Sequence, residues 1–172
     1  MSGDTALRTE VQLEKDIQFV HPVSEHATNP KAVFLTGASG FFGAYLLNEL
    51  LRTTDADIYC LIRRNKGDES VSQRLEDHLR FYSFWQNEFA SRIFPVQGDL
   101  AQSLLGLSPQ QFQELGEQLD VIYHNGAWVN SIYPYSFLKK TNVDGTREAL
   151  RLAAVGRTKP FHLTSTVAVF YS

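Results

Sequence analysis

A strand, a glycine turn and a helix follow one another within residues 32–51, and this order constrains the fold more than any other feature of the chain. Residues 33–35 are apolar and predict a buried parallel strand. Gly37, Gly40 and Gly43 follow at three-residue steps, and apolar residues then recur at helical spacing. Glycines at such a turn let the backbone pass close to a ligand, and the helix N-terminus offers N–H groups to phosphates. The segment predicts a dinucleotide-binding turn.

A second predicted strand, residues 57–62, ends in Arg63 and Arg64. At this place in the dinucleotide-binding fold an acidic residue binds the ribose hydroxyls of NAD, whereas arginine fits the 2′-phosphate of NADP. The sequence therefore favours NADP(H) over NAD(H) as the cofactor. Two alternatives stay open: a glycine turn that serves structure alone, and a strand that ends in solvated charges.

The composition limits the class of protein. With 172 residues, 43% of them apolar, the chain suits one globular domain with a substantial core. A net charge of −3 without a basic stripe argues against a nucleic-acid partner. No apolar run approaches the ~20 residues that cross a bilayer, so no membrane association and a cytoplasmic location are expected. The single cysteine, Cys60, predicts a buried thiol, and the five histidines lack metal-ligand spacing, so no metal site is expected.

Predicted strands and helices alternate along the rest of the chain. Residues 1–31 are polar and contain two prolines, and they predict an extended leader over the domain surface or the remnant of a linker. Residues 32–172 then form the NADP-binding domain. The alternation predicts a Rossmann-like, doubly wound parallel α/β sheet, truncated after about the fifth strand. Further strands are predicted at residues 92–96, 119–123 and 160–164, and further helices at residues 69–89, 109–118 and 135–154.

The residues after each predicted strand are the candidate ligand contacts, because ligands of open α/β sheets lie outside the carboxyl ends of the strands. Asp99 can accept a hydrogen bond from an adenine amino group, and Gly126 with Ala127 offers a small surface to a ribose. Gly98-Asp99 and Asn125-Gly126 are also common turn dipeptides, and this alternative stays open. The candidate cofactor contacts are Thr36, Gly37, Ser39, Gly40, Phe41, Phe42, Gly43, Arg63, Arg64, Asp99, Leu100, Asn125, Gly126 and Ala127.

The ordered motifs resemble those of the extended short-chain dehydrogenase/reductases. They are TGASGFFG, LIRR, GDL, HNGA, NVDGT and LTSTVAVF, from about residue 33 to the chain end. The chain is most similar to the thioester reductase domains that end nonribosomal peptide and polyketide assembly lines, and to their relatives in carboxylic acid and aminoadipate reductases. The motifs most specific to that subgroup are residues 122–127, Val129-Asn130, Pro134-Tyr135, Leu138 and residues 142–146.

The resemblance implies NADPH-dependent reduction of a thioester to an aldehyde, in some members onward to the alcohol. The substrate would arrive on the phosphopantetheine arm of an acyl or peptidyl carrier protein, within a larger multidomain protein. Hydride transfer places negative charge on the carbonyl oxygen, so the site needs hydrogen-bond donors and a proton source. The resemblance places the hydroxyl donor at Thr166, with Ser165 as the less favoured substitute. It gives Asn142 the role of supporting the catalytic lysine.

The resemblance also implies a Tyr-x-x-x-Lys pair some tens of residues beyond the fifth strand, and thus beyond Ser172. We therefore expect this chain to be the cofactor-binding part of a longer reductase, which binds NADPH and turns over little or nothing alone. Two alternatives stay open: another extended reductase or an epimerase, and a non-catalytic NADP-binding module. An acidic carrier could dock on a basic face that consists of Arg147, Arg151, Arg157 and Lys159. The favoured alternative is that these residues form a solvated helix face.

Overall fold

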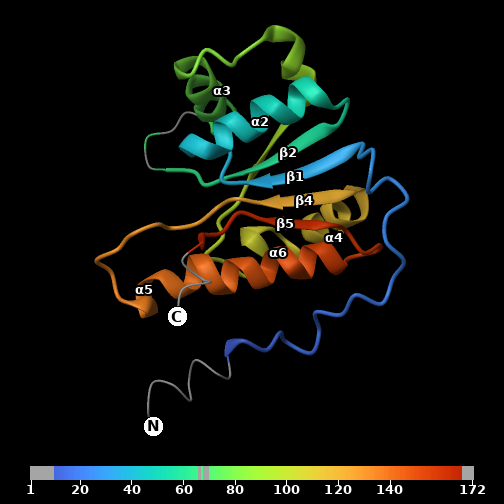
Figure 1. Ribbon diagram of the computed structural model, residues 1–172. Helices are drawn as coiled ribbons and strands as arrows, with labels where there is room; N and C mark the ends of the chain where they lie inside the picture. The colour runs from blue at the N-terminus through green and yellow to red at the C-terminus, as the bar shows by residue number, and fades with distance from the viewer. Residues whose placement is uncertain (1–9, 66, 68–69, 168–172) are drawn as a thin grey trace.

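The computed structural model of the chain describes residues 10–65, 67 and 70–167. Within these residues the centre is a sheet of five parallel strands in the order β3-β2-β1-β4-β5 (Figure 1). The strands are β1 (Ala32–Thr36), β2 (Asp57–Ile62), β3 (Ile93–Gln97), β4 (Val121–His124) and β5 (Phe161–Leu163). This arrangement confirms the predicted Rossmann-like parallel sheet.

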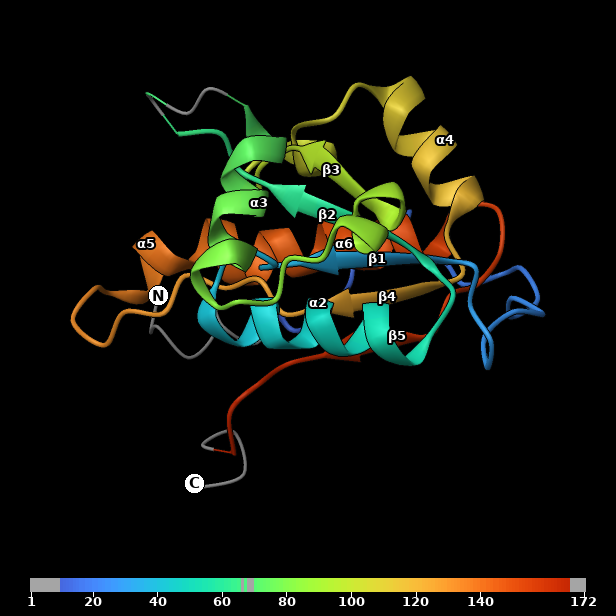
Figure 2. The same ribbon diagram turned by 90° about the horizontal axis from the view of Figure 1, so that it is seen from above.

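Helices cover both faces of the sheet (Figures 1 and 2). β1 lies at the centre and is buried along its whole length, with side chains that alternate between the two faces. Val33 and Leu35 belong to the core beneath α2 and α3, whereas Phe34 belongs to the core on the side of α4 and α6. The helices are α2 (Phe41–Thr53), α3 (Val71–Phe81), α4 (Pro109–Gln118), α5 (Tyr135–Lys139) and α6 (Gly145–Ala154).

Helix α4 has the predicted bounds because its first turn is capped by its own side chains. Ser108 Oγ accepts from the Gln111 backbone N–H at 3.2 Å, and Gln111 Oε1 accepts from the Ser108 backbone N–H at 3.0 Å. Pro109 occupies the first helical position, where no backbone N–H is needed.

The helix predicted over residues 69–89 is wrong in length, because α3 ends at Phe81. Ser83 then adopts a φ of 60°, and a short 3-10 helix at Asn87–Arg92 leads into β3. Phe84 and Trp85 pack against the core from this turn rather than from a helix face. Tertiary packing of these aromatic side chains outweighs the helical spacing.

Residues 135–154 are helical as predicted, but one turn departs from α-helical geometry. Lys140–Asp144, between α5 and α6, forms a π turn. The Gly145 backbone N–H donates to the Lys140 carbonyl, five residues earlier, which is the hydrogen bond that defines a π-helix. Such turns occur mostly as single insertions, frequently at functional sites. Asn142 lies in this turn.

The described part of the leader, residues 10–31, runs along the outside of α5 and α6 (Figure 1). Ile17 is buried, and Val23 pairs with Thr158 in an isolated β-bridge. Three leader carboxylates pair with three cations of α5 and α6: Glu10 with Lys139 (2.8 Å), Glu14 with Arg147 (3.2 Å) and Asp16 with Arg151 (2.9 Å). Two cations of the candidate basic face, Arg147 and Arg151, are therefore neutralised within the chain.

Asp120 fastens the leader to the sheet. Its Oδ2 accepts from the backbone N–H groups of Lys31 (2.9 Å) and Ala32 (3.1 Å), and its Oδ1 accepts from Ser24 Oγ (3.0 Å). Burial alone raises the pKa of Asp120, but these hydrogen bonds and the nearby Arg157 guanidinium outweigh it and leave the pKa below its usual value of 3.8.

Asp120→Asn is expected to lower the free energy of unfolding by about 1–3 kcal/mol, because a neutral amide replaces an acceptor of three hydrogen bonds. The pKa is lower in the folded chain, so the carboxylate contributes stability above about pH 4 and loses it as the pH falls further. Urea denaturation measures both effects. Asp55→Asn, the same change at an exposed carboxyl, is the control, and an equal loss in both variants would contradict the assigned role.

Candidate functional site

The carboxyl ends of the parallel strands meet at one edge of the sheet, and the glycine turn lies there. β1 pairs with β2 on one side and with β4 on the other, and the connections run outward in opposite directions from β1. This is the switch point at which open α/β sheets bind ligands. The turn of residues 37–40 connects β1 to α2 at this point.

Two of the three glycines are required by the packing of the backbone itself. Gly37 has a φ of +75°, and a Cβ there would lie 2.8 Å from the backbone nitrogen of Gly126. A Cβ on Gly43 would lie 1.9 Å from the Gly37 carbonyl oxygen. Backbone packing alone, without a ligand, therefore explains why glycine occupies these two positions.

Gly40 differs, because a Cβ there would meet only the Gly37 carbonyl oxygen, at 3.3 Å. It is the N-cap of α2, has ordinary extended dihedral angles, and provides no side-chain cap for the first turn. Phe41 and Phe42 follow with largely exposed rings. The helix thus presents its N-terminal N–H groups and dipole on a surface cleared of a Cβ, which fits the approach of a diphosphate.

Arginines gather at the end of β2. Arg63 and Arg64 are exposed directly after the strand. Arg74, from the first turns of α3, donates a hydrogen bond to the Arg63 carbonyl. Sequence reasoning missed Arg74. The sequence could have indicated it, because Arg74 lies near the start of the helix that follows β2, and that helix begins at the edge of the sheet where β2 ends.

Asp99 and Leu100 hold the loop after β3. Asp99 Oδ1 accepts from the Ala101 backbone N–H at 2.9 Å. One of the two carboxylate oxygens is therefore used within the turn itself, as the alternative of a turn dipeptide predicts. Leu100 packs closely enough that a Cβ on Gly126 would lie 2.7 Å from its Cδ1. The loop therefore supports the segment after β4 from behind.

The residues after β4 are fastened to the end of β1 by buried polar groups. Thr36 Oγ1 accepts from the Gly126 backbone N–H at 2.8 Å and lies 2.9 Å from His124 Nδ1. Thr36 is fully buried, so its hydroxyl serves this connection. Asn125 Nδ2 lies 3.5 Å from the Gly37 carbonyl, whereas the neighbouring Ala127 is exposed.

Asn142 and His124 meet through Thr146. His124 Nε2 lies 3.0 Å from Thr146 Oγ1, which in turn donates to the backbone carbonyl of Asn142 at 2.6 Å. The Asn142 side chain binds the backbone of Trp128 twice: Oδ1 accepts from its N–H at 2.7 Å, and Nδ2 donates to its carbonyl at 3.0 Å. Sequence reasoning did not assign a role to His124, Thr146 or this contact.

Ser165 and Thr166 follow the carboxyl end of β5 and are exposed. The Thr164 backbone N–H donates to the His124 carbonyl at 3.0 Å, so the chain leaves β5 beside the end of β4. The hydroxyl motif therefore begins at the same edge of the sheet as the glycine turn.

A Tyr-x-x-x-Lys spacing occurs within the chain at Tyr135 and Lys139, and sequence reasoning overlooked it. Both side chains bind Glu10 of the leader. The hydrogen bond to Glu10 raises the pKa of Tyr135 to about 12, which opposes the lowered pKa that a proton donor of carbonyl reduction needs. This pair anchors the leader.

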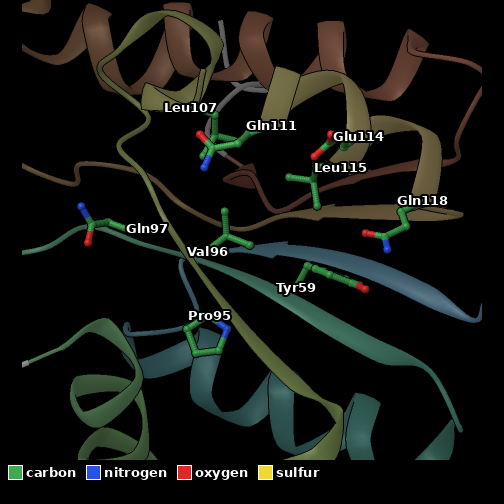
Figure 3. Close-up of a pocket in the computed structure, with 9 residues that line it drawn as sticks. All are labelled: Tyr59, Pro95, Val96, Gln97, Leu107, Gln111, Glu114, Leu115 and Gln118. Atoms are coloured by element: carbon green, nitrogen blue, oxygen red, sulfur yellow. The ribbon is translucent and has the colours of Figure 1, made fainter. Parts of the chain in front are cut away.

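Figure 3 shows a groove of about 350 Å³ between α4 and strands β2 and β3. It contains none of the predicted site residues. Its lining residues are Tyr59, Pro95, Val96, Gln97, Leu107, Gln111, Glu114, Leu115 and Gln118. The groove therefore lies on the α4 side of the sheet, apart from the glycine turn.

Within the described residues, none of the helices is long and apolar enough to cross a membrane, and the His, Cys, Asp and Glu side chains form no cluster of metal ligands. Cys60 is fully buried in β2, as predicted, and burial raises the pKa of its thiol.

Burial lowers the pKa of His124 to about 4. Because the unfolded chain has a histidine pKa near 6.5, the neutral ring contributes stability that is fully present above about pH 6.5 and is lost as the pH falls toward 4. We expect a loss of up to about 3 kcal/mol over that interval. Urea denaturation across this range should show a smaller pH dependence for His124→Asn than for the wild type. His162→Asn, at an exposed histidine, should keep the wild-type slope; a similar slope in all three proteins would contradict the prediction.

A family of NAD-binding domains described as "Male sterility protein" matches residues 35–172. A linear gramicidin synthase from Brevibacillus parabrevis is 51% identical over 96% of this chain and 3% of that protein. The L-2-aminoadipate reductase large subunit of Penicillium chrysogenum is 36% identical over 92% of this chain and 11% of that protein. The chain therefore spans a small part of these relatives.

Solved reductase domains have the same fold. The terminal R domain from the myxalamid PKS-NRPS biosynthetic pathway superposes with a TM-score of 0.90 at 45% identity, covering 98% of this chain and 43% of that one. A thiolation-reductase di-domain from an archaeal non-ribosomal peptide synthetase gives a TM-score of 0.72 at 26% identity, over 98% and 36% of the two chains. The chain belongs to the NAD-binding family described as male sterility protein, and its close relatives are the reductase domains of nonribosomal peptide synthetases and the aminoadipate reductases.

Proposed function

We propose that this chain supplies the NADPH-binding part of a reductase that converts a carrier-bound acyl or peptidyl thioester to an aldehyde. The observation that carries the proposal is the glycine turn at the switch point of the sheet, with an uncapped helix N-terminus at Gly40. The relatives support the substrate class, because they include a linear gramicidin synthase and an aminoadipate reductase.

The choice of NADPH over NADH rests on the arginines after β2. Arg63, Arg64 and Arg74 would hold the 2′-phosphate, since a guanidinium donates several hydrogen bonds to phosphate oxygens in a fixed geometry. The diphosphate would lie at the start of α2, against Ser39, Gly40 and the following backbone N–H groups. The segment 126–128 would face the ribose and nicotinamide.

NADPH supplies the hydride when bound, and the residues of the chain handle the substrate oxygen. The Thr166 hydroxyl would donate a hydrogen bond to the thioester carbonyl oxygen as it gains negative charge, with Ser165 as the substitute. Asn142 would hold the supporting lysine in place. Tyr135 is unsuited to deliver the proton, because its hydroxyl is engaged with Glu10 and its pKa is raised. We therefore expect the chain alone to bind NADPH without sustained turnover.

A carrier protein is the proposed partner, and the thiolation-reductase di-domain among the similar structures supports it. Arg147 and Arg151 are already paired with Glu14 and Asp16 of the leader. A carrier that docked on this helix face would have to displace those carboxylates, so we place carrier docking elsewhere.

Titration with NADPH and NADH, followed by nicotinamide fluorescence, tests the cofactor assignment. We expect tighter binding of NADPH, and a loss of about 10- to 100-fold in Arg63→Ala, Arg64→Ala or Arg74→Ala, because one charge-assisted hydrogen bond contributes about 1.5–3 kcal/mol. Affinity for NADH should change little in the same variants.

Arg80→Ala is the matched control, because Arg80 lies on α3 and pairs with Glu76. It should bind NADPH like the wild type. Equal affinity of the wild type for NADPH and NADH would refute the 2′-phosphate assignment, and no binding of either would refute the cofactor site.

A second assay offers the chain NADPH and a phosphopantetheinyl thioester on a carrier protein, and measures aldehyde. Sustained aldehyde formation by the 172-residue chain would overturn the expectation that it lacks a competent proton donor.

A further inference from the structure

Residues 126–128, which follow β4 closely, are held at both ends by side chains from other elements. The Gly126 backbone N–H donates to Thr36 of β1, and the Trp128 backbone is bound twice by Asn142 of the π turn. Ala127 lies between them and is exposed. We call residues 126–128 the cofactor strip, because they lie against the glycine turn: a Cβ on Gly37 would be 2.8 Å from the Gly126 nitrogen.

The two anchors of the strip are joined by a chain of hydrogen bonds whose directions are fixed. Thr146 has one hydroxyl proton, and it goes to the Asn142 carbonyl at 2.6 Å, because a carbonyl can only accept. Thr146 Oγ1 must then accept from His124 Nε2–H at 3.0 Å.

The same logic continues through the ring to β1. A neutral histidine carries one N–H, so with Nε2 protonated His124 Nδ1 is an acceptor. The Thr36 hydroxyl donates to it at 2.9 Å, and Thr36 Oγ1 accepts from the Gly126 N–H at 2.8 Å. Each donor meets an acceptor from Gly126 to Asn142, and the Asn142 side chain closes the ring back to Trp128.

We propose that His124 is a positioning residue: as the neutral Nε2–H tautomer it joins Thr36 to Thr146 and thereby sets the cofactor strip against the nicotinamide end of NADPH. This role rests on the proposed NADPH function of the site. His124 touches neither cofactor nor substrate and acts through Gly126 and Trp128. Its ring is fully enclosed, so both nitrogens depend on these two hydroxyls for partners.

Substitution at a threonine hydroxyl interrupts this closed set of hydrogen bonds with little change in side-chain shape. Thr146→Val keeps the shape of the side chain and removes the acceptor of His124 Nε2–H, whereas Thr146→Ser keeps the hydroxyl. Thr141→Val makes the same chemical change in the π turn that precedes α6, at a residue outside these hydrogen bonds. All three variants alter one partly buried side chain, so they separate loss of the hydrogen bond from loss of side-chain volume.

Two-dimensional ¹H–¹⁵N spectra of the histidine rings test the tautomer, with the His124 signal assigned by its loss in His124→Gln. We expect the neutral Nε2–H form at neutral pH in the wild type and in Thr146→Ser, and a shifted signal in Thr146→Val. The Nδ1–H form, or a charged ring at neutral pH, would overturn the proposal.

Nicotinamide fluorescence titration of the same variants tests the coupling to the cofactor. Thr146→Val should bind NADPH about fivefold more weakly, the effect of one net hydrogen bond, while Thr146→Ser and Thr141→Val should bind like the wild type. Unchanged affinity in Thr146→Val, with the expected tautomer in the wild type, would show that the ring does not position the strip.

Amide hydrogen exchange separates this inference from the cofactor proposal. The N–H groups of Gly126 and Trp128 should exchange faster in Thr146→Val than in Thr146→Ser or Thr141→Val, whether or not NADPH binds. If the wild type binds no nucleotide yet shows this pattern, the proposed function fails and the positioning of the strip stands. Equal exchange in all variants would overturn the positioning itself.

Discussion

The close approach of α2 to the end of β1 is the contact on which the rest of the structure depends. Gly43 lies so near the Gly37 carbonyl that no side chain fits between them. This contact sets the start of α2 directly behind the turn, and Gly37 in turn admits the backbone of Gly126. Strand, turn, helix and the segment after β4 are therefore fixed by backbone packing, and this packing does not explain the remaining glycine, Gly40.

The sheet could be predicted from the sequence because its signals are local. Apolar runs bounded by turn residues located all five strands to within about two residues, and Ser108 with Pro109 located the start of α4. The prediction failed where packing between distant elements decides the outcome. The aromatic residues after Phe81 have helical spacing, yet they reach the core from an irregular turn.

The gathering of the candidate site residues at one edge of the sheet was predictable for the same reason, since parallel strands bring their carboxyl ends together. What the sequence could not reveal were contacts between residues far apart in the chain. His124 and Thr146 acquire partners only once β1, β4 and the helix are assembled. The Tyr135–Lys139 spacing is misleading without Glu10, which engages both side chains.

The π turn carries a further consequence for how this helix can change in evolution. A π turn holds one residue more than an α-helical turn, so the faces of α5 and α6 are offset from a single regular helix. Deleting one residue within 140–144 would restore a continuous α-helix, and it would also rotate Asn142 away from Trp128. Insertions and deletions in this segment are therefore constrained by register, because the Asn142 side chain must face the Trp128 backbone.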